Sequence, residues 1–330
     1  MIDLMGKKYY FFALSAIIIL AGAVTFFIRG GFNLDIQFKG GTIIEMQMTD
    51  KGVDEKTANE YKLDTAKAEK IVVDITKKNV TIQKEIIPDP KNGKLKVVLM
   101  SLGIASQDAL SQTERQNVEN AIIKAFELNS SNAIFSQNSY EPFIGKELLN
   151  NGLLAIFFAS ILIILYIWYR FKIMSGLSAG VMAILALIHD ILLMLSVYLF
   201  FNIVVNEALI AAILTVIGYS MNDTIIIYDR IRENSSQLRK MPIGELVNRS
   251  IVETLNRSIS TVVTVLICVT TVYVFARIYG IRSIQEFTLP LIIGVSSGCY
   301  SSIFIASPLW ILWKESQEKQ RLAARKATRG

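Results

Sequence analysis

The chain has 330 residues and a formal net charge of +6, and 52% of its residues are hydrophobic. This apolar fraction is too high for one soluble domain, and the apolar residues lie in long blocks with few charges, as in transmembrane helices. One histidine cannot form a multi-histidine metal site, and the spacing of Cys268 and Cys299 predicts neither a disulfide nor a zinc site. Basic residues gather at the ends of the apolar blocks, which indicates membrane orientation and argues against nucleic acid as a partner.

Six apolar blocks are long enough to cross a bilayer as helices. They cover residues 9–28, 150–169, 175–202, 207–228, 259–276 and 287–313. The first block follows Lys7 and Lys8, as a signal peptide would, but its apolar core is longer than that of a typical signal and no A-x-A cleavage motif follows it. We therefore predict a polytopic α-helical membrane protein with a retained first helix.

A polar segment, residues 29–149, separates the first two spans and is long enough for one small domain. Its pattern predicts four strands and two helices in the order β-α-β-β-α-β. The strands are expected at 42–48, 80–87, 94–100 and 133–139, and the helices at 64–78 and 107–127. A Pro-Asp-Pro-Lys-Asn-Gly run after residue 87 is typical of a hairpin turn. This order predicts an α+β, ferredoxin-like domain, a fold that implies no function by itself.

The positions of Lys and Arg predict which parts of the chain face the cytoplasm. Sixteen of them lie in residues 1–8, in the connection after the second span, in an amphipathic segment at 229–258 and in the tail 314–330. The short connections on the opposite side hold only Arg29, Arg277 and Arg282. By the positive-inside rule, both termini are cytoplasmic and the inserted domain is extracytoplasmic.

Two polar pairs lie inside spans: His189–Asp190 in the third and Asn222–Asp223 in the fourth. A charge there costs from about 2.5 to more than 10 kcal/mol, so it usually faces the bundle interior and marks function. Burial favours the neutral form of a carboxylate and a guanidinium favours the charged form, so a carboxylate between the two can carry a proton. We predict Asp223 as this carrier and Arg257, at the start of the fifth span, as its counter-charge. The alternative is a structural role, in which these polar residues only hold helices together.

Several polar side chains are positioned to support Asp223. Tyr219 and Ser220 precede it by about one helical turn, and Asn222 and Thr224 flank it. Their hydroxyl and amide groups can hydrogen-bond a carboxylate. We predict these four residues, together with His189 and Asp190, as supporting polar residues.

Small residues at intervals of four predict close helix contacts, because they let two backbones approach each other in lipid. They are Gly176 and Gly180 in the third span and Gly294, Gly298 and Ser302 in the sixth. The serine-rich run around residues 296–302 is unusually polar for lipid contact, so we expect it to face other helices or a hydrated path.

Motifs spread over all six spans resemble one known family. They are QFKGGT, SYEPFIGKEL, IHDILL, IGYSMNDTIIIYDRIREN, ETLNRSIST and GVSSGCYSSIFIASPLW, in chain order. Together they resemble the SecD/SecF family of protein-export subunits, in its SecF branch, which belongs to the RND superfamily. Residues 50–130 match only in topology. Two positions depart from the family pattern: Gln37 replaces the usual aspartate, and Ser258 replaces a threonine.

The resemblance implies that this chain forms half of an RND-type bundle and that a separate SecD chain supplies the other half. It implies an accessory subunit of the Sec translocase in the bacterial cytoplasmic membrane, coupled to the proton-motive force and acting late in export on the outer face. The SecYEG channel with SecA, and exported polypeptides, would be further partners. In the family, the aspartate matching Asp223 relays protons and the arginine matching Arg257 is its partner.

Three other functions share parts of this pattern. An intramembrane aspartyl protease also has aspartates on consecutive spans, but its Gly-x-Gly-Asp motif reads Ser-Met-Asn-Asp here. An RND-type proton-coupled exporter of small solutes would need a second half and a second external domain. A purely structural translocon subunit would keep the same partners without moving protons. We predict no enzyme activity, no catalytic residues and no metal or cofactor site.

Overall fold

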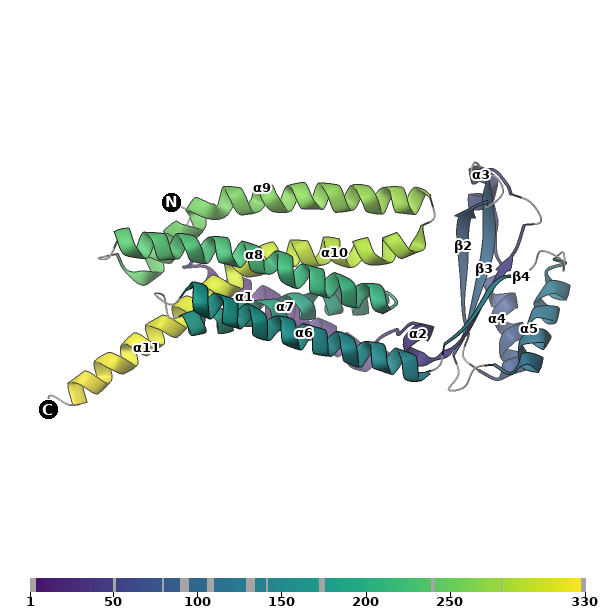
Figure 1. Cartoon of the computed structure of the whole chain (residues 1–330), viewed down its shortest axis with the longest axis horizontal. Coiled ribbons are helices and arrows are strands. Elements are labelled where there is room, and N and C mark those ends of the chain that lie inside the picture. Colours follow the sequence, from purple (N-terminus) through teal and green to yellow (C-terminus); the bar gives the residue numbers. More distant parts are fainter. Residues whose placement is uncertain are drawn as a thin grey trace.

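The computed structural model describes residues 4–49, 52–78, 80–89, 95–105, 110–128, 134–140, 142–171, 176–238, 241–279 and 281–327. Parts of the predicted hairpin turn after residue 87, the first residues of the N-terminus and the last three residues of the tail lie outside these ranges. The molecule is elongated, with a helical bundle at one end and a small sheet domain at the other (Figure 1).

Six stretches of helix in the described part of the chain are long and apolar enough to cross a membrane, which confirms the predicted six-helix architecture. The helices of the bundle are α1 (Lys8–Arg29), α6 (Pro142–Arg170), α7 (Gly176–Phe201), α8 (Glu207–Gln237), α9 (Ile243–Ile278), α10 (Arg282–Ser301) and α11 (Ser307–Ala327). A short π-helix, Ser302–Ala306, joins α10 to α11, and these three elements together form the sixth stretch.

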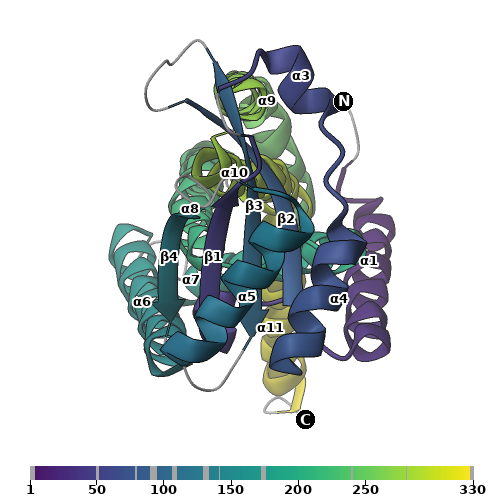
Figure 2. The same cartoon turned by 90° about the vertical axis from the view of Figure 1, so that its right-hand side faces the viewer.

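The inserted domain has the predicted ferredoxin-like topology. Its sheet has the order β2-β3-β1-β4, and every pair of neighbouring strands is antiparallel. The strands are β1 (Gly41–Gln47), β2 (Val80–Pro88), β3 (Lys96–Ala105) and β4 (Ile134–Tyr140), and the helices are α3 (Glu55–Glu60), α4 (Thr65–Thr76) and α5 (Gln112–Ala125). Both α4 and α5 cover the face of the sheet that points away from the bundle (Figures 1 and 2).

Side chains along each strand point alternately to the two faces of the sheet, and the apolar side chains on one of these faces pack against α4 and α5. Ile44 and Met46 of β1 and Met100 and Leu102 of β3 are fully buried against the helices, because side chains two residues apart share a face. Helix α5 begins at a capping box, in which Ser111 and Glu114 each bond the other's backbone N–H. Helix α3, which follows β1, is an element that the sequence pattern did not predict.

The inserted domain is attached to the bundle by short, paired connections. After α1, the four-residue helix α2 (Ile36–Lys39) leads into β1. Just before it, Asp35 N donates to Val205 O at 2.9 Å and Val205 N donates to Asn33 O at 2.8 Å, which ties the linker to the loop between α7 and α8. The start and the end of the inserted domain lie side by side, because Gly41 at the beginning of β1 pairs with Tyr140 at the end of β4.

Helices α7, α8 and α10 form the buried centre of the bundle, and α1, α6 and α9 lie outside them. The outer helices expose large apolar side chains that a membrane or a partner would cover, such as Ile17 of α1, Leu162 of α6 and Ile267 of α9. Two glycines of α10 let it approach α8 closely. A Cβ on Gly298 would lie 2.8 Å from Ser220 Cβ and 3.3 Å from Ser220 Cα, and a Cβ on Gly294 would overlap Val216.

The substitution Gly298→Ala is expected to lower the stability of the bundle by about 1–3 kcal/mol, because an added methyl group overpacks a tight contact. Gly180→Ala is the matched control on α7: the nearest atom to its added Cβ is 3.6 Å away, an ordinary contact. Thermal unfolding of both variants in detergent tests the contrast. Equal midpoints for the two variants would show that the α8–α10 contact is not tight in the folded protein.

Candidate functional site

Asp190 lies at the centre of a cluster of hydroxyl groups inside the bundle. The side chain is 1% exposed, and it accepts a hydrogen bond from Ser297 at Oδ1, at 2.6 Å. Ser220 and Ser301 donate to Oδ2 at 2.8 and 2.7 Å. Hydrogen bonds to a charged acceptor are about twice as strong as neutral ones. One carboxylate therefore joins α7, α8 and α10.

His189 extends this cluster to α1. Its Nδ1 atom lies 3.2 Å from Asp190 Oδ1, and its Nε2 atom lies 3.0 Å from Ser15 Oγ. Ser15 Oγ is 3.2 Å from the Tyr300 hydroxyl, which donates to the Phe11 carbonyl at 2.8 Å. The hydrogen-bonded chain thus runs from α7 through α1 to α10 and back to the α1 backbone.

Asp223 has a different environment from Asp190. The side chain is 4% exposed, yet its Oδ2 atom is buried and accepts no hydrogen bond from the described residues. Ser258 of α9 interacts with this carboxyl group, but its hydroxyl is also buried and makes no hydrogen bond there. Nearly all buried polar atoms in proteins are paired, so an unpaired carboxyl oxygen inside the bundle marks an unusual place. A carboxyl group with a vacant oxygen can take up a proton without breaking an existing bond.

Arg257 directly precedes Ser258 on α9, and its side chain is exposed. No ion pair between Arg257 and Asp223 occurs among the described residues, so the expected counter-charge lies next to Ser258 but does not contact the Asp223 carboxyl group. Asn222, predicted as a supporting residue, is exposed beside Asp223, and Tyr219 is half-buried.

The hydroxyls of Ser220 and Thr224 form hydrogen bonds with side chains other than Asp223, so their predicted support of Asp223 stays a prediction. Ser220 donates to Asp190, and the Thr224 hydroxyl pairs with Ser302 Oγ at 2.8 Å. The physical reason is the position of α8 between three helices: residues four apart share the face towards α10, while Asp223 is turned towards α9. Ser302, expected only as a packing residue, therefore also forms a hydrogen bond between α8 and the π-helix.

Sequence reasoning did not identify Ser15, Ser297, Tyr300 and Ser301 as site residues. The spacing of Ser297 and Ser301 is the signal that could have found two of them, since residues four apart lie on one face of a helix and can bond one acceptor. No pattern in the first span singles out Ser15. Close by, Gly22 of α1 packs against Ser196 of α7 so tightly that a Cβ there would overlap it.

Charged side chains form a network at the end of the bundle far from the inserted domain. Glu253 of α9 accepts from Arg230 at 2.6 Å, from Arg249 at 2.8 Å and from Asn234 at 2.9 Å. Arg170 of α6 pairs with Asp229 at 3.0 Å. These residues fix the ends of α6, α8 and α9 relative to one another.

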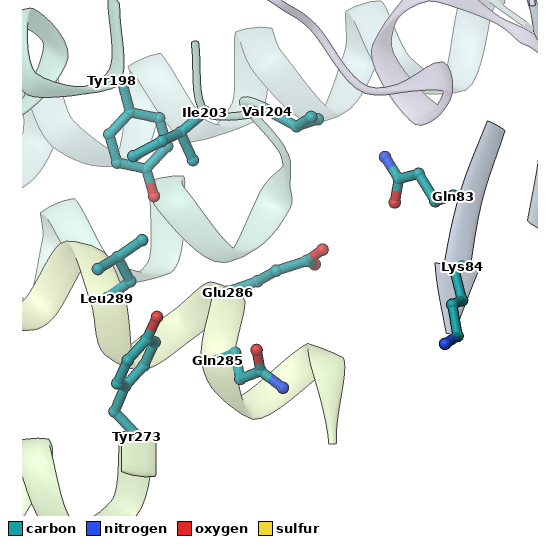
Figure 3. A pocket seen from close by; sticks show the side chains of 9 residues that line it. All are labelled: Gln83, Lys84, Tyr198, Ile203, Val204, Tyr273, Gln285, Glu286 and Leu289. Atoms are coloured by element: carbon teal, nitrogen blue, oxygen red, sulfur yellow. The ribbon is translucent and has the colours of Figure 1, made fainter. Parts of the chain in front are cut away.

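A pocket of about 260 Å³ lies at the opposite end, between the sheet and the bundle (Figure 3). Residues from β2, α7, α9, α10 and the loop after α7 line it: Gln83, Lys84, Tyr198, Ile203, Val204, Tyr273, Gln285, Glu286 and Leu289. Glu286 accepts from Asn206 Nδ2 at 2.6 Å. Lys84 donates to the Ala58 and Tyr61 carbonyls at 2.8 and 2.6 Å, and burial lowers the pKa of its ammonium group. Among the described residues, no group of three or more His, Cys, Asp or Glu side chains could hold a metal ion.

A bundle of six membrane-capable helices, with carboxylates at its centre and a ferredoxin-like domain after its first helix, has the architecture of a polytopic membrane protein. Residues 121–316 match a family model described as "Protein export membrane protein SecD/SecF, C-terminal". The chain belongs to this family of protein-export membrane proteins, which confirms the resemblance of its motifs.

Relatives and solved structures agree with this assignment. The chain is 32% identical to the protein translocase subunit SecF of Alicyclobacillus acidocaldarius, over 99% of this chain and 96% of that one. It is 29% identical to the protein translocase subunit SecDF of Bacillus subtilis, over 96% of this chain and 39% of that one. The crystal structure of SecDF from Thermus thermophilus, described as a translocon-associated membrane protein, matches with a TM-score of 0.72 at 29% identity and covers 95% of this chain and 39% of that one. The chain thus spans nearly the whole SecF relative but about two fifths of the SecDF chains.

Proposed function

We propose that this chain is an accessory subunit of the Sec translocase that uses the proton-motive force to promote late steps of polypeptide export. The observation that carries this proposal is Asp223, a buried carboxyl group in the bundle whose Oδ2 atom has no hydrogen-bond partner among the described residues. A proton can bind there and leave again. Membership in a protein-export family supplies the process that the proton would drive.

Arg257 is the proposed partner of Asp223 in this relay. It lies one residue from Ser258, which interacts with Asp223, so a small rotation or shift of α9 would bring its guanidinium group closer. A guanidinium beside the carboxyl group favours release of the proton, and its withdrawal favours uptake. Moving one charge across the membrane potential contributes about 2.3 kcal/mol per 100 mV, enough to bias two conformations.

The second half of the bundle is proposed to be SecD, and α9 is proposed to face it. The outer face of α9 is apolar and exposed and contains a groove lined by Val263, Leu266, Ile267, Thr270, Thr271, Val274 and Phe275. Arg257 of α9 and Asn222 of α8 are exposed as well. The SecDF chain of Bacillus subtilis matches this chain over 39% of its own length, so the rest of that chain is long enough to hold a second half of the bundle. SecYEG, SecA and exported polypeptides complete the proposed set of partners.

The proposed location is the bacterial cytoplasmic membrane, with both termini inside and the inserted domain outside. The charged network around Glu253 and the basic residues of α11 lie at the end of the bundle far from the inserted domain, as the positive-inside rule requires (Figure 1). The inserted domain would then meet an exported chain as it emerges on the outer face.

Removing the inserted domain tests its proposed role. Because Gly41 pairs with Tyr140, residues 42–139 can be replaced by a short Gly-Ser linker without separating α2 from α6. We expect the shortened chain to insert into the membrane and to keep its partner, but to lose the stimulation of late export. The measurement is the release of a secreted reporter from spheroplasts, with co-purification of the partner as the control. Normal release by the shortened chain would show that the domain does not act on exported polypeptides.

A further inference from the structure

The series of hydrogen bonds through His189 ends in an acceptor on each side, the Phe11 carbonyl and the Asp190 carboxylate. At one end, the Phe11 carbonyl can only accept, so the Tyr300 hydroxyl 2.8 Å away donates its proton there. At the other end, Asp190 accepts from three serine hydroxyls at 2.6 to 2.8 Å, as a carboxylate does. The protons between these ends therefore have few possible positions.

The Ser15 hydroxyl sits between two neighbours and has one proton to donate. Its oxygen lies 3.2 Å from the Tyr300 oxygen and 3.0 Å from His189 Nε2. When Ser15 donates to Tyr300, its oxygen accepts from His189, so Nε2 carries a proton. When Ser15 donates to His189, Nε2 is unprotonated.

On the other side of the ring, a proton lies between His189 Nδ1 and Asp190 Oδ1 in both arrangements. The two atoms are 3.2 Å apart, and two lone pairs facing each other at that distance would repel. With Ser15 turned to His189, the ring is neutral and its one proton is on Nδ1. With Ser15 turned to Tyr300, the pair holds one more proton, on Nε2. Both arrangements satisfy both ring nitrogens.

From this geometry we infer that His189 and Asp190 form a proton-binding pair, separate from Asp223, that gains and loses one proton as the Ser15 hydroxyl turns. The pair joins α7 to α1 through Ser15 and to α8 and α10 through the serines on Asp190. A part for this proton in export rests on the proposed function. The binding of the proton itself does not.

The neighbouring helices bring few other titratable groups towards the pair in the described part of the chain. Tyr300 of α10 is in the hydrogen-bonded chain, and Asp223 of α8 lies three residues after Ser220. Tyr219 and Cys299 interact electrostatically with Asp223. The tyrosines of α1 and α6 point outward, with exposed fractions of 51 to 78%: Tyr9, Tyr10, Tyr166 and Tyr169. Charged residues of α1 and α6 lie near helix ends (Lys8, Arg29 and Arg170), and the first charged residue of α11 is Lys314, after its apolar N-terminal part. Asp223 is therefore the neighbouring titratable group that a test of the His189–Asp190 pair must control for.

His189 is the single histidine of the chain, so a ¹⁵N-histidine label reports on this pair alone when the purification tag contains no histidine. The experiment is solid-state NMR of the full chain in lipid bilayers, from about pH 5 to about pH 9, which brackets the usual titration of histidine. We expect both ring nitrogens to carry protons at the acidic end. At the basic end we expect Nε2 to lose its proton and Nδ1 to keep its own.

Three variants separate the pair from its surroundings. In Asp190→Asn the carboxylate is gone, and in Ser15→Ala the acceptor for Nε2 is gone, so the doubly protonated ring should be lost or reduced in both. In Asp223→Asn the two-state titration should persist. A ring that does not change with pH, a neutral ring with its proton on Nε2, or loss of the titration in Asp223→Asn would each overturn the inference. Export assays of Asp223→Asn are independent of this signal, so failure of the pair and failure of the proposed function can be told apart.

Discussion

Replacing Asp223 with asparagine is expected to abolish the stimulation of export by the proton-motive force, while the subunit still folds and assembles. The two side chains have the same size, but the amide cannot titrate. Because Oδ2 accepts no hydrogen bond from the described residues, an amide in its place breaks no bond seen there. Export should fall to the level of membranes that lack this chain.

The measurement compares export into inverted vesicles with and without a protonophore. Asp229→Asn is the matched control: it is the same substitution on the same helix, but at a partly exposed ion pair with Arg170 and Arg232. Such pairs contribute about 0–1 kcal/mol, so we expect this variant to keep the stimulation. Stimulated export that persists in Asp223→Asn would refute the proton relay and leave a structural subunit as the better description.

Replacing Asp190 with leucine is expected to destroy the folded bundle. The hydroxyls of Ser220 and Ser297 would lose their acceptor in a buried place, and Ser301 would keep only its bond to the Gly298 carbonyl at 3.2 Å. Each buried polar group left unpaired costs about 1–3 kcal/mol, and the sum is comparable with the total stability of about 5–15 kcal/mol for a folded protein. The measurement is the yield of monodisperse protein in detergent and its thermal midpoint.

A rescue variant distinguishes lost hydrogen bonds from a simple clash. Replacing both partners of a hydrogen bond by apolar groups can be nearly neutral, whereas removing one partner is costly. Asp190→Leu combined with alanine at Ser220, Ser297 and Ser301 should therefore recover much of the lost stability. If the single variant is as stable as the native chain, Asp190 does not hold the three helices together.

The apolar blocks, and the order of the predicted strands and helices along the chain, were enough to predict the bundle and the inserted domain. Apolar blocks report burial in lipid directly, and the order of strands and helices restricts a small domain to few topologies. The strand pairing β2-β3-β1-β4 followed from that order, although the sequence did not indicate α3. Family membership followed from motifs that are long and occur in a fixed order.

The partners of individual polar side chains could not be predicted in the same way. Helical periodicity shows that Ser220 and Asp223 are one turn apart, but not which helix each of them faces. The structure directs Ser220 to Asp190 and leaves Asp223 Oδ2 unpaired, so two carboxylates that look equivalent in sequence have opposite surroundings. Ser15 and His189 are 174 residues apart in the sequence, so their contact is set by tertiary packing alone.

The break in the sixth span also depends on local chemistry that a hydropathy pattern does not contain. Pro308 has no N–H to donate to the carbonyl four residues before it. The turns just before it form the π-helix Ser302–Ala306, and Ser307 Oγ donates to the Ser302 carbonyl at 3.1 Å. Such π-turns occur often at functional sites, and this one carries Ser302, which pairs with Thr224.

The serines around Asp190 also set an order of events during synthesis of the chain. Ser220 follows Asp190 by 30 residues, but Ser297 and Ser301 follow it by 107 and 111. At roughly 5–20 residues per second, α7 leaves the ribosome about 5–20 s before the last two donors exist. During this interval the newly synthesised third span carries a carboxylate that lacks two of its three serine donors. A chain that ends before residue 297 lacks two of the three serine donors to this buried carboxylate, so the third span cannot reach its final hydrogen bonding until the sixth span has been made.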